Sequence, residues 1–456
     1  MDMILLVLII YFLLIFAIAW FFSRKSSLES YFINKRKSSL WLLTFSNVAT
    51  IVGAGATVAV ISEVYNSGIS YGFALPISLV VGVLILGFMA KKIKKIGDEY
   101  GAQTIVDFFH KRFDVKNKVL TSILQVFLLI IWVGVQAVAV ASLASVLVGI
   151  DYQIALFLAA AVTILYTSIG GLKIDLISDF VQFWIIFLVF IVMATISYSH
   201  VGGLSNLISN LPAGHLDIFA FGGISWFIGV ILLSGFLYLG NTSHWQRIFS
   251  AESQNTAKKS FFFAIPFVLI LGILTLFLGL VAAVTLSGIK QETAIFSLME
   301  NILPGALAGV GFAAILAVIM SSIDSFLIGG STIIYRGLFK KDELNNKKEL
   351  LSARLITGMF GILGFFLAFM VPNIITLSLV VTYLALIFVP AIFAGIYSKK
   401  FSANASFYSI LIPTIVLFCI YPLVKENTFV ITTPLSIVIV LFYDKIFKRK
   451  DFLLTK

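Results

Sequence analysis

The sequence predicts an all-α, polytopic membrane protein with about 13 transmembrane helices. Its 456 residues are 60% hydrophobic and only 12% charged, and their mean hydropathy is +1.08. About 13 helices of about 20 residues each would use about 260 residues, which is close to the hydrophobic share of the chain. Two further observations support this prediction. The chain divides into long apolar stretches, and its basic residues fall almost entirely in alternate connecting segments.

The apolar stretches are long enough to cross a bilayer as helices. In chain order they are residues 3–22, 39–62, 69–90, 119–149, 153–169, 174–198, 223–243, 260–287, 304–335, 353–371, 374–397, 404–424 and 428–446. The first has Asp2 in place of a basic start and is followed by Arg24 and Lys25. We therefore interpret it as an uncleaved signal-anchor whose N-terminus lies outside the cell.

The basic residues predict the orientation of these spans. With the N-terminus outside, every Lys and Arg except Lys290 and Lys425 falls in a cytoplasmic segment, as the positive-inside rule requires. The net charge of +11 therefore reflects topology in the cytoplasmic membrane, with a cytoplasmic C-terminus. Nucleic acid is not an expected partner, because no loop joins a basic patch to interleaved aromatic residues.

The remaining composition excludes several other classes. Cys419 is the single cysteine, so an intrachain disulfide and a cysteine-based metal site are excluded. No loop is long enough to fold as a soluble domain of about 50 residues or more. We therefore expect residues 1–456 to form one transmembrane transporter domain.

Hydroxyl and carboxyl side chains interrupt the ninth span, 304–335, at membrane depth. Ser321, Ser322, Asp324 and Ser325 fall within one and a half turns of the predicted helix. Their oxygens are hard ligands that suit a hard cation such as Na⁺, and polar groups at this depth usually mark a pathway. The alternative is that the serines bond to their own helix or join neighbouring helices. The clustering favours the ion site.

Glycines weaken the second span, 39–62, at a similar depth. The run from Ser46 to Thr57 contains Gly53 and Gly55 among small residues. An unwound stretch here would free carbonyl oxygens for substrate and ions, as in the broken helices of transporters. Close packing of small residues against a neighbouring helix explains the same pattern equally well.

The sixth span, 174–198, follows Gly170 and Gly171 and carries two carboxyl groups near its inner end. Asp179 lies about 10 Å from that end, at a depth similar to that of the hydroxyls of the ninth span. Asp175 lies one turn nearer the cytoplasm, where we expect its side chain to reach water.

The seventh span, 223–243, is interrupted by Ser234, Tyr238 and Asn241 and ends before Arg247 at its cytoplasmic side. Spans two and seven are five spans apart and run in opposite directions, as inverted repeats of five helices predict. We therefore expect an extra N-terminal span at 3–22, repeat one at 39–198, repeat two at 223–397 and two extra C-terminal spans at 404–446.

These motifs resemble the signatures of the sodium:solute symporter family. Gly170-Gly171-Leu172 through Ser178-Asp179 and Gln182 is similar to its first signature, although Asp175 replaces a small apolar residue. Ser321-Ser322-x-Asp324-Ser325, followed by Ser331-Thr332, is similar to its second. The resemblance covers nearly the whole chain. It implies a LeuT-type core (spans 2–6 and 7–11) and sodium-coupled import of a small polar organic solute by alternating access. We expect a monomeric transporter rather than an enzyme.

Carried over by position, the resemblance implies three sets of site residues. The main sodium site would use backbone carbonyls and hydroxyls of Ala49, Val52, Val318, Ser321 and Ser322. A second sodium site, present in some members, would use Asp179, Ser321, Asp324 and Ser325. The solute would contact Gly53, Ala56, Thr57, Gln136, Ser234, Tyr238 and Asn241, and Trp132 and Tyr383 are aromatic candidates for gating or for packing. We expect no basic side chain at mid-depth.

A proton-coupled permease of the same architecture is the main alternative, with Asp179 or Asp324 as the titrating group. A channel would need a continuous polar lining, and an intramembrane hydrolase would need a base beside the serines. The sequence indicates neither. The solute stays open among sugars, amino acids, carboxylates and vitamins.

Overall fold

The computed structural model describes residues 2–23, 27–338, 346–371, 374–425 and 428–454. In these ranges the chain is helical almost throughout and contains no β-strand. Twelve of the described helices are long and apolar enough to cross a membrane, and a bent pair of shorter helices provides a thirteenth span. The predicted all-α class and number of spans are therefore confirmed. Arg24 and Lys25, which helped to orient the first span, lie outside the described residues.

The spanning elements follow the predicted order. They are α1 (Asp2–Ser23), the pair α3 (Leu40–Ile51) and α4 (Val58–Ser67), α5 (Ile69–Tyr100), α7 (Val115–Val148), α8 (Tyr152–Gly170), α9 (Leu172–His200), α11 (Gly223–Leu233) with the 3-10 helix η3 (Ser234–Gly240), α13 (Gln254–Thr285), α15 (Ala306–Leu338), α16 (Asn346–Met370), α17 (Ile374–Tyr397), α18 (Ala403–Val424) and α19 (Phe429–Leu454). Shorter helices connect them, namely α2 (Leu28–Ile33), η1 (Asn34–Arg36), η2 (Ala54–Ala56), α6 (Ile105–Arg112), α10 (Leu204–Ser209), α12 (Thr242–Ser250), η4 (Gln291–Thr293) and α14 (Ala294–Ile302).

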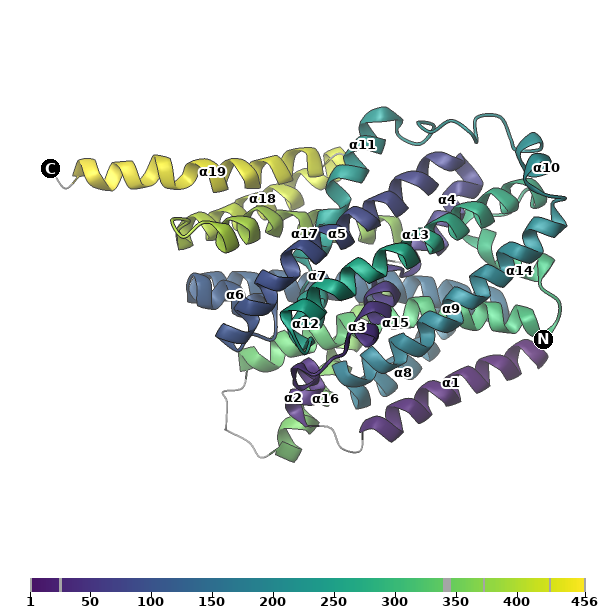
Figure 1. Cartoon of the computed structure of the whole chain (residues 1–456), viewed down its shortest axis with the longest axis horizontal. Coiled ribbons are helices and arrows are strands. Elements are labelled where there is room, and N and C mark those ends of the chain that lie inside the picture. The colour runs from purple at the N-terminus through teal and green to yellow at the C-terminus, as the bar shows by residue number, and fades with distance from the viewer. Residues whose placement is uncertain (1, 24–26, 339–345, 372–373, 426–427, 455–456) are drawn as a thin grey trace.

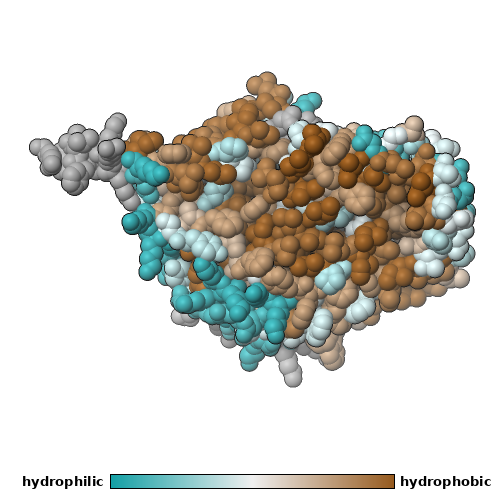
Figure 2. Space-filling model, turned by 45° about the horizontal axis from the view of Figure 1, so that its top comes forward, coloured by the Kyte–Doolittle hydropathy of each residue, from teal (hydrophilic) through white to brown (hydrophobic). Residues whose placement is uncertain are grey.

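Apolar side chains cover much of the outer surface. Figure 2 shows hydrophobic residues across the middle of one face, with hydrophilic residues gathered toward its ends. Large apolar side chains on different helices are exposed, among them Leu13, Phe88, Phe157 and Met359. A soluble protein rarely exposes so much contiguous apolar surface, whereas a bilayer requires it. The chain is therefore a multi-pass membrane protein.

Two of the spans are broken, and for the second span this is one of the two explanations that its glycine pattern left open. In the second span, α3 stops at Ile51, and the chain turns by 72° before it continues toward α4. In the seventh span, α11 tightens into η3, and Asn241 takes up an extended conformation before α12 begins. Close contact explains Gly240 in this second break, because an added Cβ would lie 2.1 Å from the carbonyl oxygen of Ala385.

The helix α15 forms the centre of the bundle. It has the largest buried share of any described candidate span and packs against α7, α9, α3 and α1. The first helix, α1, also contacts α8 and α9, whereas α18 and α19 pack on each other and on α17. In Figure 1, α1 and the α18–α19 pair lie on opposite flanks of the bundle. The hydroxyl-bearing face of α15 is therefore enclosed by protein.

Candidate functional site

The end of α3 meets the serine face of α15. The Ser321 hydroxyl donates to the carbonyl oxygen of Ala49 at 3.1 Å and to that of Val318, in its own helix, at 3.0 Å. Ser322 donates to the carbonyl oxygen of Thr50 at 3.3 Å. These α3 carbonyls are available because a helix leaves the carbonyls of its last turn without intrahelical partners.

This contact gathers three oxygens, from Ala49, Val318 and Ser321, around one point between the helices. The hydroxyl bonds both to its own helix and to a neighbouring helix, which is the bonding that the purely structural interpretation of the serines predicts. The same oxygens are also the ligand type that a hard cation prefers. Rotation of the hydroxyl would turn its lone pairs toward such a cation. Of the predicted main sodium ligands, Ser321 therefore contacts both Ala49 and Val318.

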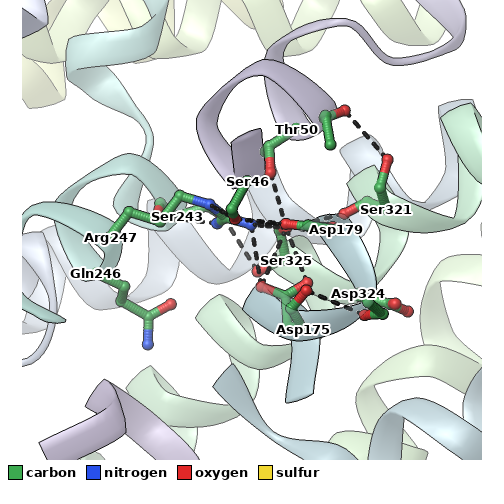
Figure 3. Close-up of polar contacts among 12 residues, drawn as sticks. Ser46, Thr50, Asp175, Asp179, Ser243, Gln246, Arg247, Ser321, Asp324 and Ser325 are labelled. Atoms are coloured by element: carbon green, nitrogen blue, oxygen red, sulfur yellow. Dashed lines mark hydrogen bonds and ion pairs between the residues drawn. The ribbon is translucent and has the colours of Figure 1, made fainter. Parts of the chain in front are cut away.

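A buried ionic cluster lies beside this contact (Figure 3). The Arg247 Nη2 atom lies 2.8 Å from an Asp179 carboxylate oxygen and 3.0 Å from an Asp175 carboxylate oxygen. The same atom donates to the Ser325 hydroxyl at 2.6 Å, and Nε donates to the Ser46 hydroxyl at 2.9 Å. Both carboxyl groups and the guanidinium are at most 1% exposed. Charges this deeply buried require such pairing.

The side chain of Arg247 is buried inside the bundle, which the sequence did not predict. Counting along the seventh span placed Arg247 at the cytoplasmic end. However, the break at η3 ends the span early, and α12 starts a new, fully buried helix at Thr242. The side chain of Arg247 therefore points inward rather than to water.

Asp175 is also buried, which corrects the expectation that it reaches the cytoplasm. The helix α9 begins after Gly171, where the backbone φ is +66° and an added Cβ would lie 2.5 Å from the Tyr31 ring. Tyr31 belongs to α2, which packs over the start of α9. The first turns of α9 are thus covered, and the Asp175 side chain contacts Arg247 and Ser325 instead of solvent.

Asp324 faces a different neighbour. Its carboxylate accepts hydrogen bonds from Thr167 at 2.5 Å and from the Tyr166 hydroxyl, both on α8. Among the residues predicted for the second sodium site, Asp179 and Ser325 contact Arg247. Ser321 contacts α3, and Asp324 contacts α8. Asp179 and Ser325 also contact α3, through the hydroxyls of Ser46 and Thr50. Three of the four side chains therefore contact α3, whereas Asp324 is bound by α8.

Part of the predicted solute site lies at the break in the second span. Thr57 donates to the carbonyl oxygen of Gly53 at 3.0 Å, and the Gln136 side-chain oxygen accepts from the Ala54 backbone N–H at 3.3 Å. Ala56 is buried in the same segment. These residues are therefore positioned together by α7 and the break.

The predicted solute residues of the seventh span have other contacts. The Tyr238 ring packs edge-on against His244, with 5.0 Å between ring centroids. The Asn241 side chain caps α12 by accepting from the Ser243 N–H at 2.9 Å. Ser234 is half-buried at the start of η3. These side-chain contacts lie within η3 and α12, and η3 itself packs against α5 and α17.

The two aromatic candidates differ in their surroundings. Trp132 stacks on Phe326 of α15 with 5.5 Å between ring centroids, close to the serine face. Tyr383 packs against Tyr421 and Phe429, which belong to the extra C-terminal helices. Packing therefore accounts for Tyr383, whereas Trp132 stays next to the candidate site.

A model of the sodium:solute symporter family matches residues 31–413. The chain belongs to this family.

Full-length relatives agree with this membership. The chain is 27% identical over 438 residues to a sodium/pantothenate symporter of Haemophilus influenzae, and the match covers 90% of this chain and 88% of that protein. It is 26% identical over 413 residues to an osmoregulated proline transporter of Bacillus subtilis, covering 86% and 83%. A solved Na⁺-coupled sialic acid symporter, substrate-bound and outward-open, has a TM-score of 0.84 and 17% identity, covering 98% of both chains. The predicted LeuT-type fold is confirmed.

Several residues of the candidate site were not among those predicted from the sequence. Ser46 and Arg247 join the two predicted carboxyl groups of α9, and Thr167 and Tyr166 bind Asp324. One signal was present in the sequence. Asp175 and Arg247 are opposite charges at the inner ends of the sixth and seventh spans, so pairing between them could have been considered.

Proposed function

We propose that the protein is a sodium-coupled symporter that imports a small polar organic solute by alternating access. The observation that carries this proposal is the 3.1 Å contact between the Ser321 hydroxyl and the Ala49 carbonyl oxygen. A cation at this point would bind α3 and α15 together. Membership of the sodium:solute symporter family supports Na⁺ as that cation.

In the proposed mechanism, Na⁺ replaces the direct hydrogen bonds between the two helices. The ligands would be Ala49, Val52, Val318, Ser321 and Ser322. Because α3 ends at the break, fixing its last turn also fixes the unwound segment that follows. Na⁺ and solute then favour the same conformation, and each strengthens the binding of the other by the same factor.

The membrane potential supplies part of the driving force. Moving one positive charge inward down about 100 mV releases about 2.3 kcal/mol, before any concentration gradient of Na⁺ is counted. This free energy corresponds to roughly a 50-fold gradient of solute. The direction of import assumes the predicted N-out orientation, and we propose that a monomer suffices for transport.

The solute would bind beside the two breaks. Gly53, Thr57 and Gln136 already lie together, and Ala56 is buried in the same segment. We propose that the opposite wall comes from Ser234 and Tyr238 of η3 and from Asn241, which follows it. A small polar solute of the sugar, amino acid, carboxylate or vitamin class fits this mixture of amide, hydroxyl and backbone groups.

A proton-coupled permease is the second candidate, because one of the three buried carboxyl groups here, that of Asp324, makes no ion pair with Arg247 among the described residues and has two neutral hydrogen-bond donors instead. Asp175 and Asp179 pair with Arg247, whereas Asp324 is held by the neutral side chains of Tyr166 and Thr167. A carboxyl group in such surroundings is a candidate proton carrier. Uptake driven by a pH gradient in the absence of Na⁺ would favour this function over the first.

Thermal unfolding of the purified protein tests the proposal with known probes. The protein is titrated with NaCl against KCl at constant ionic strength, alone and with pantothenate, proline or glucose. We expect stabilisation by Na⁺ and not by K⁺, and further stabilisation by a transported solute only when Na⁺ is present. Ser322→Ala should weaken the apparent Na⁺ affinity by about tenfold or more, since it removes one ligand.

Ser409→Ala is the matched control, because Ser409 is also a buried helical serine that donates to a backbone carbonyl, that of Ser406. It lies on α18, outside the proposed site, and should leave the Na⁺ response unchanged. Equal stabilisation by Na⁺ and K⁺, or an unaltered Na⁺ response in Ser322→Ala, would contradict the proposal.

A further inference from the structure

A single nitrogen atom of Arg247 occupies the centre of the buried ionic cluster. Nη2 lies 2.6 Å from the Ser325 hydroxyl, 2.8 Å from Asp179 and 3.0 Å from Asp175. These oxygens come from two helices, α15 and α9, and the guanidinium comes from a third, α12. Positive charge at this point is therefore surrounded by oxygen ligands in the way that a bound metal cation would be.

Two of these oxygens belong to residues expected to bind a second Na⁺. Asp179 and Ser325 were placed in that site by the family resemblance, and both now contact Nη2 of Arg247. One position cannot hold the nitrogen and a sodium ion together. The guanidinium is covalently attached, so this cation is part of the protein and does not exchange with solution.

Asp175 explains why the guanidinium stays in this position. Asp175 and Asp179 lie four residues apart on α9, so they share one face of that helix. Two carboxylates on one face repel each other unless a cation lies between them. Arg247 contacts both, and Ser46 holds its Nε from the side of α3. Asp175 also stands where the family signature has a small apolar residue, so the second carboxylate is a feature of this chain.

We propose that the Arg247 guanidinium takes the place of a second coupling cation, with Asp175 as the positioning residue that holds it there. The protein then binds one Na⁺, at the contact between α3 and α15. This inference rests on the proposed function and specifies its stoichiometry. It also accounts for Asp324, which faces α8 and is not needed to complete a second site.

Equilibrium binding of ²²Na⁺ to the purified full-length protein in detergent tests the stoichiometry without a known solute. The wild-type protein should bind one Na⁺ per chain with a Hill coefficient of about one. The double variant Arg247→Met with Asp175→Asn removes one positive and one negative charge and leaves Asp179 and Ser325 without their cation. It should bind two Na⁺ per chain.

Two further variants separate this effect from general structural damage. Adding Asp179→Asn to the double variant should return the number of bound Na⁺ to one per chain, because this substitution removes the carboxylate of the new site. Arg247→Lys restores a positive charge at the same position and should also bind one Na⁺. Gel filtration and thermal unfolding identify variants that fail to fold. If the variants do not fold, the number of Na⁺ bound per wild-type chain alone tests the inference.

Two Na⁺ bound to the wild-type protein would overturn the inference, as would a folded double variant that still binds one. Failure of the proposed function gives a different result. In that case the wild-type protein would show no saturable Na⁺ binding, or binding that Ser321→Ala and Ser322→Ala leave unchanged. The two hypotheses can therefore fail separately.

Discussion

Gln125 and Gln136 lie about three turns apart on α7, and each binds the backbone at the break of a different span. Gln136 accepts from the Ala54 N–H in the second span at 3.3 Å. Gln125 donates to the Gly240 carbonyl oxygen at 2.6 Å and accepts from the Thr242 N–H at 3.2 Å in the seventh span. One unbroken helix thus satisfies backbone groups that both breaks expose.

We expect Gln125→Leu to lower the stability of the protein by about 2–5 kcal/mol, since it leaves two buried backbone groups without partners. Thermal unfolding in detergent measures the loss. Gln136→Leu removes a single hydrogen bond and should cost less. Gln153→Leu, at an exposed position on α8, is the control. If Gln125→Leu unfolds at the same temperature as Gln153→Leu, Gln125 does not support the break.

Gly53→Ala should weaken Na⁺ binding without unfolding the protein. An added Cβ would lie 2.5 Å from the Ser322 hydroxyl oxygen, so that hydroxyl must rotate away from α3. We expect an apparent Na⁺ affinity about tenfold lower, measured by Na⁺-dependent thermal stabilisation.

Gly55→Ala is a closely matched control for this experiment. Gly55 lies in the same break, but an added Cβ would meet nothing within 4 Å. Its Na⁺ response should stay close to that of the wild-type protein. A similar loss in both variants would indicate that the break tolerates no side chain at all, and that Ser322 is not the residue affected.

The sequence predicted the features that depend on local composition. Long apolar runs determine the spans, and glycines with polar neighbours mark both breaks, because a weakened helix is a property of its own residues. The contact between Ala49 and Ser321 followed from the family resemblance, and the geometry agrees with it.

The buried positions of Asp175 and Arg247 could not be predicted by counting along the spans. Each residue lies close to a cytoplasmic end, where a charged side chain ordinarily reaches water. Asp175 is enclosed because α2 covers the start of α9, and Arg247 is enclosed because α12 begins anew after η3. Both causes are contacts between segments far apart in the sequence, which no local pattern encodes.

The predicted orientation can be tested by labelling cysteines with a membrane-impermeant maleimide. Cys419, which is exposed, is first replaced by Ser. In intact cells, Asn210→Cys should be labelled because its loop is expected outside, whereas Lys95→Cys should react only after permeabilisation. Both native side chains are exposed. The opposite labelling pattern would reverse the predicted topology.

The carboxylate of Asp324 depends on α8 for its hydrogen bonds, and Thr167→Val should expose this dependence. The substitution keeps the side-chain shape but removes a 2.5 Å hydrogen bond to a buried carboxylate. A hydrogen bond contributes about 0.5–1.5 kcal/mol between neutral groups and about 1.5–3 kcal/mol to a charged group, so we expect a loss of about 0.5–3 kcal/mol in thermal unfolding. Thr195→Val is the control, since the Thr195 hydroxyl is exposed and bonds only to the Ile191 carbonyl oxygen of its own helix. If both variants lose the same small amount, the Tyr166 hydroxyl alone is sufficient to hold Asp324.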